Sequence, residues 1–158
     1  MNRSTRLTPT DWTDAALVAM AETGTAGVNV EQLARRLGTT KGSFYHHFEN
    51  RQALLEAAIE RWEAIVAADL SESVAITDPR GRLLAGSLVG IDAKLDGFVD
   101  LALAASMHDA AVATALARVN ARRIDWLTGA LIDAGFEPPN ARNRALRGLS
   151  GYLGLYQL

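Results

Sequence analysis

Residues 38–54 read GTTKGSFYHHFENRQAL, and this stretch decides the fold of the first part of the chain. It predicts one short helix, which begins after a cap at Thr39 or Thr40 and ends near Phe48. At about 3.6 residues per turn, Phe44 and Phe48 lie about 40° apart and define a buried side. The opposite, exposed side holds Gly42, Ser43, Tyr45 and His46, with Lys41 and His47 at its edges.

A second short helix precedes this one, and a tight turn joins the two. Apolar residues at helical spacing predict it, at Val30, Leu33, Ala34 and Leu37. Asn29 and Gln32 form a capping-box pattern at its start. Gly42 costs about 1 kcal/mol relative to alanine in a helix interior, and close approach of another molecule would compensate. Two short helices joined by a glycine-containing turn predict a helix-turn-helix, whose second helix enters the major groove of DNA.

The charge distribution indicates an anion-binding surface in the same place. Residues 35–51 hold four cations and one acid, a balance of +3, whereas residues 52–158 hold ten cations and thirteen acids, a balance of −3. The next helix, capped by Asn50, presents free backbone N–H groups beside Arg51. These features predict a phosphate-binding surface, although a solvated helix face explains the charge alone equally well.

The ordered motif VNVEQLARRLGTTKGSFYHHFENRQALLEAAIE strongly resembles the DNA-binding domain of the tetracycline-repressor (TetR) family. The likeness extends over about residues 8–62. The residues that carry it are Val28, Val30, Leu33, Ala34, Leu37, Gly38, Gly42, Ser43, Phe44, Tyr45, Phe48, Leu54 and Leu55. The resemblance implies an all-α protein. Its N-terminal three-helix helix-turn-helix DNA-binding domain would be joined by a long fourth helix to an α-helical regulatory and dimerisation domain.

The resemblance also implies a role for each exposed residue of the motif, which covers about residues 30–49. The base-facing positions are Thr39, Thr40, Gly42 and Ser43. The positions that mostly hold phosphates are Lys41, Tyr45, His46 and Arg51. His46 would also be able to read a base, and His47 could serve either purpose. The family binds double-stranded operator DNA as a homodimer, with two recognition helices in successive major grooves of a near-palindrome. An unknown small-molecule effector would release the DNA, so we expect a ligand-responsive repressor.

Helical patterns continue to the end of the chain, which favours the all-α class. Thr8 and Pro9 open a first helix that Gly24 ends. The later helices are expected at about residues 51–70, 79–89, 96–107 and 109–135, and from FEPPN to the end. We therefore expect a DNA-binding domain over residues 1–51 and a ligand-binding and dimerisation domain over residues 52–158.

The second domain is expected to carry both the dimer interface and the effector site. By the resemblance, the seventh and last helices form the interface. Apolar residues that line a cavity, or simply form the core, are Trp62, Phe98, Leu103, Met107 and Trp126. Glycines that would admit another helix are Gly148, Gly151 and Gly154. Because the last helix stops without a cap, we expect an abbreviated dimer face or a truncated chain.

Composition excludes several other classes of protein. The chain has 158 residues, a net charge of −2 and no cysteine, so disulfides, thiolate nucleophiles and cysteine zinc sites are ruled out. The start, MNRSTRLTPTDW, lacks the apolar segment of a secretory signal, and no apolar run is long enough to span a bilayer. We expect a cytoplasmic protein without a membrane partner.

Catalytic and metal sites have weak candidates. His46 and His47 point to different helix faces and have no carboxylate at ligand spacing, so we expect no metal and no cofactor. The pairs His108 with Asp109, and Asp92 with Asp96, lack a serine elbow or an oxyanion motif, so we expect no enzyme.

Two further alternatives concern the basic residues and the whole chain. Arg35 and Arg36 are expected to pair with acids such as Glu31 rather than bind DNA. The alternative function is a helical dimerisation module that does not bind an operator.

Overall fold

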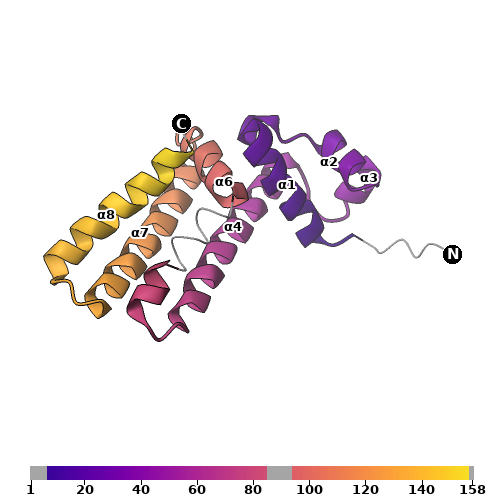
Figure 1. Ribbon diagram of the computed structural model, residues 1–158. Coiled ribbons are helices and arrows are strands. Elements are labelled where there is room, and N and C mark those ends of the chain that lie inside the picture. The colour runs from indigo at the N-terminus through magenta and orange to yellow at the C-terminus, as the bar shows by residue number, and fades with distance from the viewer. Residues whose placement is uncertain (1–6, 85–93, 157–158) are drawn as a thin grey trace.

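The computed structural model describes residues 7–84 and 94–156, and every regular element among them is helical. This confirms the expected all-α class. Figure 1 shows the N-terminal helices at one end of the molecule and the paired last two helices at the other. Within the described ranges, no helix combines the length and the apolar character that a membrane span requires.

Four short elements form the N-terminal part: α1 (Pro9–Thr23), the 3-10 turn η1 (Thr25–Gly27), α2 (Val30–Arg36) and α3 (Lys41–Phe44). The predicted caps explain their boundaries. Thr8 accepts a hydrogen bond from the Asp11 backbone N–H and completes a capping box with the Asp11 side chain. Asn29 caps α2 through the Gln32 N–H, at 3.0 Å. Gly38 has φ +64°, a left-handed conformation that lets the chain turn sharply after α2.

The remaining described helices are α4 (Arg51–Val74), α6 (Lys94–Ala104), α7 (Ala110–Asp133) and α8 (Pro138–Leu155). Asn50 caps α4 by accepting from the Ala53 N–H at 2.9 Å, and Asp109 caps α7. Residues 79–84 are helical as predicted, and the rest of the expected helix over about residues 79–89 lies outside the described residues.

A single apolar core runs through both predicted domains. It begins with Trp12 and Met20 of α1, continues through Leu54 and Trp62 of α4, and reaches Val119 of α7. Burying side chains of this size provides most of the driving force for folding. Because α4 contributes to the core along most of its length, it connects the N-terminal helices to the C-terminal ones.

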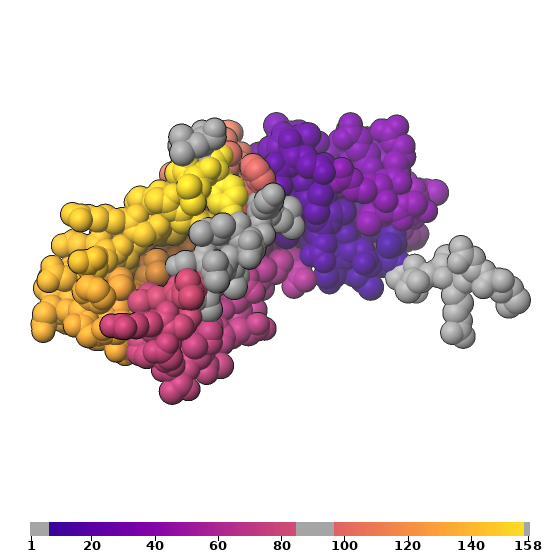
Figure 2. All heavy atoms as spheres, viewed as in Figure 1, coloured from indigo at the N-terminus to yellow at the C-terminus, as the bar shows by residue number. Residues whose placement is uncertain are grey.

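A second connection links α6 to the N-terminal helices. Helix α6 packs against α1, and the hydroxyl groups of Thr25 in η1 and Ser106 after α6 lie 2.5 Å apart in a hydrogen bond. In Figure 2 the N-terminal helices form one lobe at one end of the molecule. Movement of either α4 or α6 would therefore be transmitted to the N-terminal lobe.

Candidate functional site

Helix α3 is fixed to the N-terminal lobe by its aromatic residues. Phe44 is fully buried, and its ring meets Trp12 edge-on with centroids 5.4 Å apart. Phe48 stacks on the other side of Phe44 at 5.7 Å. Aromatic pairs in these geometries add to the stabilisation from area burial alone. The predicted buried side of this segment is confirmed.

The segment is shorter as an α-helix than the sequence predicted. Helix α3 ends at Phe44, and residues 45–47 continue as a hydrogen-bonded turn. In that turn the backbone N–H groups of His47 and Phe48 both donate to the Phe44 carbonyl, at 2.9 and 3.0 Å. Thr40 is the cap, because its hydroxyl accepts from the Ser43 N–H at 3.4 Å. The polar residues thus project from one helical turn and the turn that follows it.

The polar face of this segment is open to solvent. Its exposed residues are Thr40, Lys41, Gly42, Tyr45 and His46, and its half-buried ones are Thr39, Ser43 and His47. Tyr45 is 56% exposed although its ring also touches Phe44 edge-on at 5.2 Å. A Cβ on Gly42 would meet only the Thr40 hydroxyl, at 3.5 Å, which is an ordinary contact. Since the fold itself would accept a side chain there, the glycine leaves space for something outside the chain.

Lys41 is held by a carboxylate on the preceding helix. Its Nζ lies 2.5 Å from Oε1 of Glu31, and both side chains are about half exposed. The hydrogen bond and charge of Lys41 lower the pKa of Glu31, and Glu31 raises the pKa of Lys41 for the same reasons. Exposed pairs of this kind contribute little to stability, so Lys41 is readily released to another anion.

The side chain of Arg51 has hydrogen-bond partners that the sequence did not predict. Its guanidinium group turns inward, where Nε donates to the Val28 carbonyl at 2.7 Å and Nη2 donates to the Thr25 carbonyl. Charged donors satisfy buried carbonyls well, so Arg51 ties the η1 loop to the start of α4. The guanidinium group therefore faces the η1 loop here, and its phosphate contact stays a prediction. The backbone N–H groups of the first turn of α4 keep their predicted position.

The other two arginines of the basic segment differ from each other. Arg36 pairs with Glu22 of α1 at 2.6 Å, so pairing with an acid is confirmed, although the acid is not Glu31. Arg35 is exposed, and no ion pair joins it to another described residue.

The five residues predicted to line a ligand cavity do not all line the same cavity. Trp62 and Leu103 are buried core residues, at 2% and 0% exposure, whereas Phe98 and Met107 are 42% and 57% exposed. Of the five, only Trp126 lines the cavity that α4, α7 and α8 enclose. Helical spacing identifies a buried face but not which helices meet there, so the spacing did not predict which residues share a cavity.

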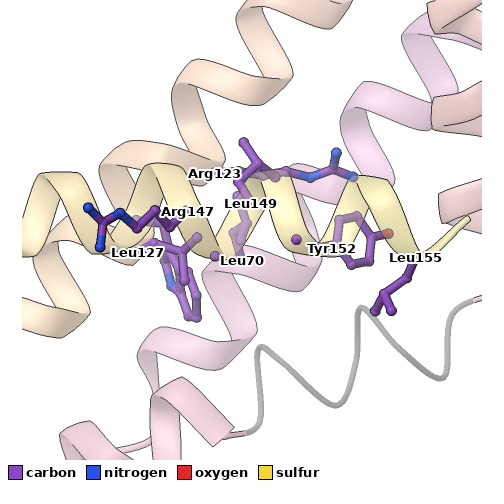
Figure 3. A pocket seen from close by; sticks show the side chains of 10 residues that line it. Leu70, Arg123, Leu127, Arg147, Leu149, Tyr152 and Leu155 are labelled. Carbon is purple, nitrogen blue, oxygen red and sulfur yellow. The ribbon is translucent and has the colours of Figure 1, made fainter. Parts of the chain in front are cut away.

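That cavity lies between α4, α7 and α8 and measures about 360 Å³. Its walls are Leu70, Arg123, Trp126, Leu127, Arg147, Gly148, Leu149, Gly151, Tyr152 and Leu155. Figure 3 shows Arg147 at one end of this row and Tyr152 and Leu155 at the other. The volume is in the usual range for small-molecule sites. Gly148 and Gly151, which the sequence suggested as helix contacts, face open space here, so they widen the cavity.

A family model matches the N-terminal region just described. The model for bacterial regulatory proteins of the tetR family covers residues 13–58, which include α1, α2, α3 and the start of α4. Over this region the chain is similar to regulatory proteins of the tetR family. This confirms the resemblance found in the sequence.

One curated protein is similar in sequence to part of this chain. Tetracycline repressor protein class A from transposon 1721 of Escherichia coli is 38% identical over 78 residues, which are 49% of this chain and 35% of that protein. The match thus spans about a third of the curated relative.

Solved structures resemble more of the chain. The crystal structure of a transcriptional regulator from Rhodococcus sp. Rha1 is 26% identical with a TM-score of 0.76, over 94% of this chain and 81% of that one. The crystal structure of AibR in complex with isovaleryl coenzyme A and operator DNA shares the fold. It has 22% identity and a TM-score of 0.67, over 93% of this chain and 86% of that one.

A buried ion pair that the sequence did not predict borders the cavity. Arg123 Nη1 donates to both carboxylate oxygens of Asp100, at 3.0 and 2.8 Å. The guanidinium group also lies over the rings of Trp62 and Tyr152, at 5.7 and 5.6 Å. One signal was available, since Asp100 and Arg123 each interrupt an apolar helix face, but their partnership depends on the packing of α6 on α7.

The candidate catalytic and metal-binding residues have other positions. The Asp109 carboxylate accepts from the Ala111 and Val112 N–H groups and caps α7, beside His108. Asp92 and the Asp96 side chain lie outside the described residues. In the described part of the chain, no three His, Asp or Glu side chains form a group suited to a metal ion.

Proposed function

We propose that this protein is a sequence-specific DNA-binding transcriptional regulator. One observation carries the proposal: the α3 segment presents a continuous polar face to solvent while Phe44 anchors it from below. A major groove admits a helix of this kind, and side chains with hydroxyl and imidazole groups can contact base edges. The match of residues 13–58 to the model for bacterial regulatory proteins of the tetR family supports the same function.

The exposed residues divide into two groups by reach and chemistry. Thr39, Thr40, Gly42 and Ser43 face the bases, because they are small and lie at the start of the segment. Contacts to phosphates come from Lys41, Tyr45 and the N-terminus of α4, which lie beside that start. His46 and His47 continue the same face and serve either purpose. Arg51 supports these contacts indirectly by holding η1 against α4.

We further propose that the regulator acts as a homodimer on a near-palindromic operator and represses transcription. Helices α7 and α8 pack side by side and leave Ile132 and Leu146 about two-fifths exposed. Pairing two such helix pairs would form a four-helix bundle and place two α3 segments on one duplex. In this arrangement, residues 1–51 bind DNA and residues 52–158 bind the partner and an effector, in the cytoplasm.

The effector is proposed to bind in the cavity between α4, α7 and α8. AibR, which shares the fold, was crystallised with both isovaleryl coenzyme A and operator DNA. An effector changes DNA affinity only if its affinity differs between the DNA-binding conformation and another one. Helix α4 lines this cavity and also reaches the N-terminal lobe, so a shift of α4 would change both the cavity and the position of α3.

Fluorescence anisotropy with the DNA upstream of the chain's own gene tests the proposal. Specific binding is expected to exceed binding to a scrambled duplex by about a thousandfold or more. The logarithm of the affinity should fall linearly with the logarithm of the salt concentration. Replacing Lys41 by glutamine should flatten this slope, whereas replacing the exposed Arg142 of α8 by glutamine should not. A stable dimer without any discrimination between duplexes would favour the alternative, a helical dimerisation module.

A further inference from the structure

The cavity between α4, α7 and α8 combines an apolar wall with hydrogen-bond donors. Its apolar side consists of Leu70, Leu127, Leu149 and Leu155. Its donors are the guanidinium groups of Arg123 and Arg147 and the indole N–H of Trp126. That indole nitrogen is buried and has no acceptor among the described residues. The unpaired Trp126 N–H and the two guanidinium groups favour a ligand that is an anion with an apolar body.

One of these cations already binds a carboxylate. Arg123 is 7% exposed and holds Asp100, which is 2% exposed, through two short hydrogen bonds. A guanidinium group matches the two oxygens of a carboxylate in both spacing and charge. Arg123, at the edge of the cavity, is therefore placed to bind a carboxylate, and in this structure it binds that of Asp100.

Arg147 supplies the second charge and lies at the opposite end of the cavity (Figure 3). It is exposed, and no carboxylate among the described residues pairs with it. Its neighbour Arg142 pairs with Asp125 at 3.7 Å, so the two arginines of α8 are in different situations. An unpaired cation at a cavity attracts anions from solvent.

The Asp100–Arg123 pair connects the cavity to the N-terminal lobe. Asp100 lies on α6, and α6 packs against α1. If Arg123 turned to another anion, Asp100 would lose these two hydrogen bonds and their countercharge while still being buried. Such a charge is strongly unfavourable, so α6 would have to move to let water reach it.

We propose that the effector is a small carboxylic acid with an apolar body, which competes with Asp100 for Arg123. This inference rests on the proposed function, because it names the ligand class and the coupling step of that regulator. The apolar body lies along the four leucines, and the carboxylate takes the guanidinium group of Arg123. Release of Asp100 then shifts α6 against α1 and lowers the affinity of α3 for DNA.

Binding of defined probes to the full chain tests the ligand class without DNA. Octanoate and phenylbutyrate are compared with their uncharged amides by calorimetry and by tryptophan fluorescence. The fluorescence comes from Trp12, Trp62 and Trp126, of which Trp126 lines the cavity. The acids are expected to bind about tenfold or more tightly than the amides, because the amides lose a charge-assisted hydrogen bond. Equal binding of acid and amide, or no binding of either acid up to about 1 mM, would overturn the proposal.

The coupling step has a test of its own. Asp100→Asn keeps the shape of the side chain but removes the competing charge. The acids should then bind about tenfold more tightly, while DNA binding weakens even without them. A merely structural role of Asp100 would instead weaken both. Asp125→Asn, which removes an exposed carboxylate of α7, is the matched control.

Two further variants locate the site. Gly151→Leu fills the cavity and should abolish acid binding, and since a Cβ there meets nothing within 4 Å, the helix should tolerate it. Gly129→Leu on α7 also enters open space and does not line the cavity, so acid binding should persist. Arg147→Gln should weaken acid binding severalfold, whereas Arg142→Gln should not. Unchanged acid binding in Gly151→Leu would place the ligand elsewhere and overturn the assignment.

These measurements separate the two proposals. If the acids bind and Asp100→Asn tightens them but no duplex is preferred, the regulator function fails and the carboxylate site stands. If the upstream duplex is bound specifically but acids and amides behave alike, the regulator function stands and the carboxylate site fails.

Discussion

The N-terminal lobe and the C-terminal helices differ in the range of the contacts that make their candidate sites. The DNA-facing segment depends on residues close in sequence, such as Phe44 and Phe48 with the Thr40 cap. The cavity depends on Leu70, Arg123 and Tyr152, which three different helices bring together. A locally specified site can be inferred from sequence pattern, whereas a site between distant helices requires the tertiary structure.

The largest expected effect would break the local site. Phe44→Ala removes a fully buried ring from between Trp12 and Phe48 and should lower the free energy of unfolding by about 3–5 kcal/mol. Chemical denaturation followed by circular dichroism measures this. Phe98→Ala, a change of the same size at a ring that is 42% exposed, should cost much less. Similar losses in the two variants would contradict the anchoring role of Phe44.

A comparable effect is expected from the distant pair that borders the cavity. Arg123→Met leaves Asp100 buried without its ionic partner and should destabilise the protein by about 3–5 kcal/mol. The double variant with Asp100→Leu should recover much of this loss, because it removes the stranded charge. Thermal unfolding of both proteins is the measurement, and failure of the second change to restore stability would contradict a pairwise role.

A smaller effect distinguishes the two possible roles of Arg51. Arg51→Gln breaks hydrogen bonds to the Val28 and Thr25 carbonyls and should cost about 1.5–3 kcal/mol of stability. The salt dependence of DNA binding should remain the same, since the guanidinium group does not face outward. A slope reduced by about one would instead restore the phosphate contact that the sequence predicted.

The smallest expected effect concerns the exposed Glu31–Lys41 pair. Glu31→Gln releases Lys41 and removes a negative charge beside the polar face, so DNA affinity should rise a few-fold at low salt. Lys41 lowers the pKa of Glu31. The ion pair is therefore fully formed at pH values above the ordinary carboxyl pKa, and it is lost as the pH falls through the lowered pKa. Anisotropy titrations at two salt concentrations test this, and an unchanged affinity would mean that Lys41 does not reach the duplex.

The helices α1, α2 and α3 were predicted from the sequence more completely than the cavity was, and the reason is physical. Caps such as Thr8, Asn29 and Asn50 act within three residues, so their patterns are visible in the sequence. The hydrogen bonds of Arg51 to η1 were not predicted, because the nearness of a cation to a helix N-terminus does not reveal which carbonyls it can reach. Arg123 was missed because its partner Asp100 is on another helix, and only the packing of α6 on α7 makes the two neighbours.

The three-residue turn η1 is held from two sides at once. Arg51 at the start of α4 grips its Thr25 carbonyl, and Ser106 beyond α6 shares a hydrogen bond with the Thr25 hydroxyl. Thr25 is therefore a residue at which movements of α4 and α6 meet, in addition to the direct packing of both helices against α1. A substitution that removed the hydroxyl of this one threonine would loosen the η1 turn from the α6 side, while the backbone bond to Arg51 would still tie it to α4.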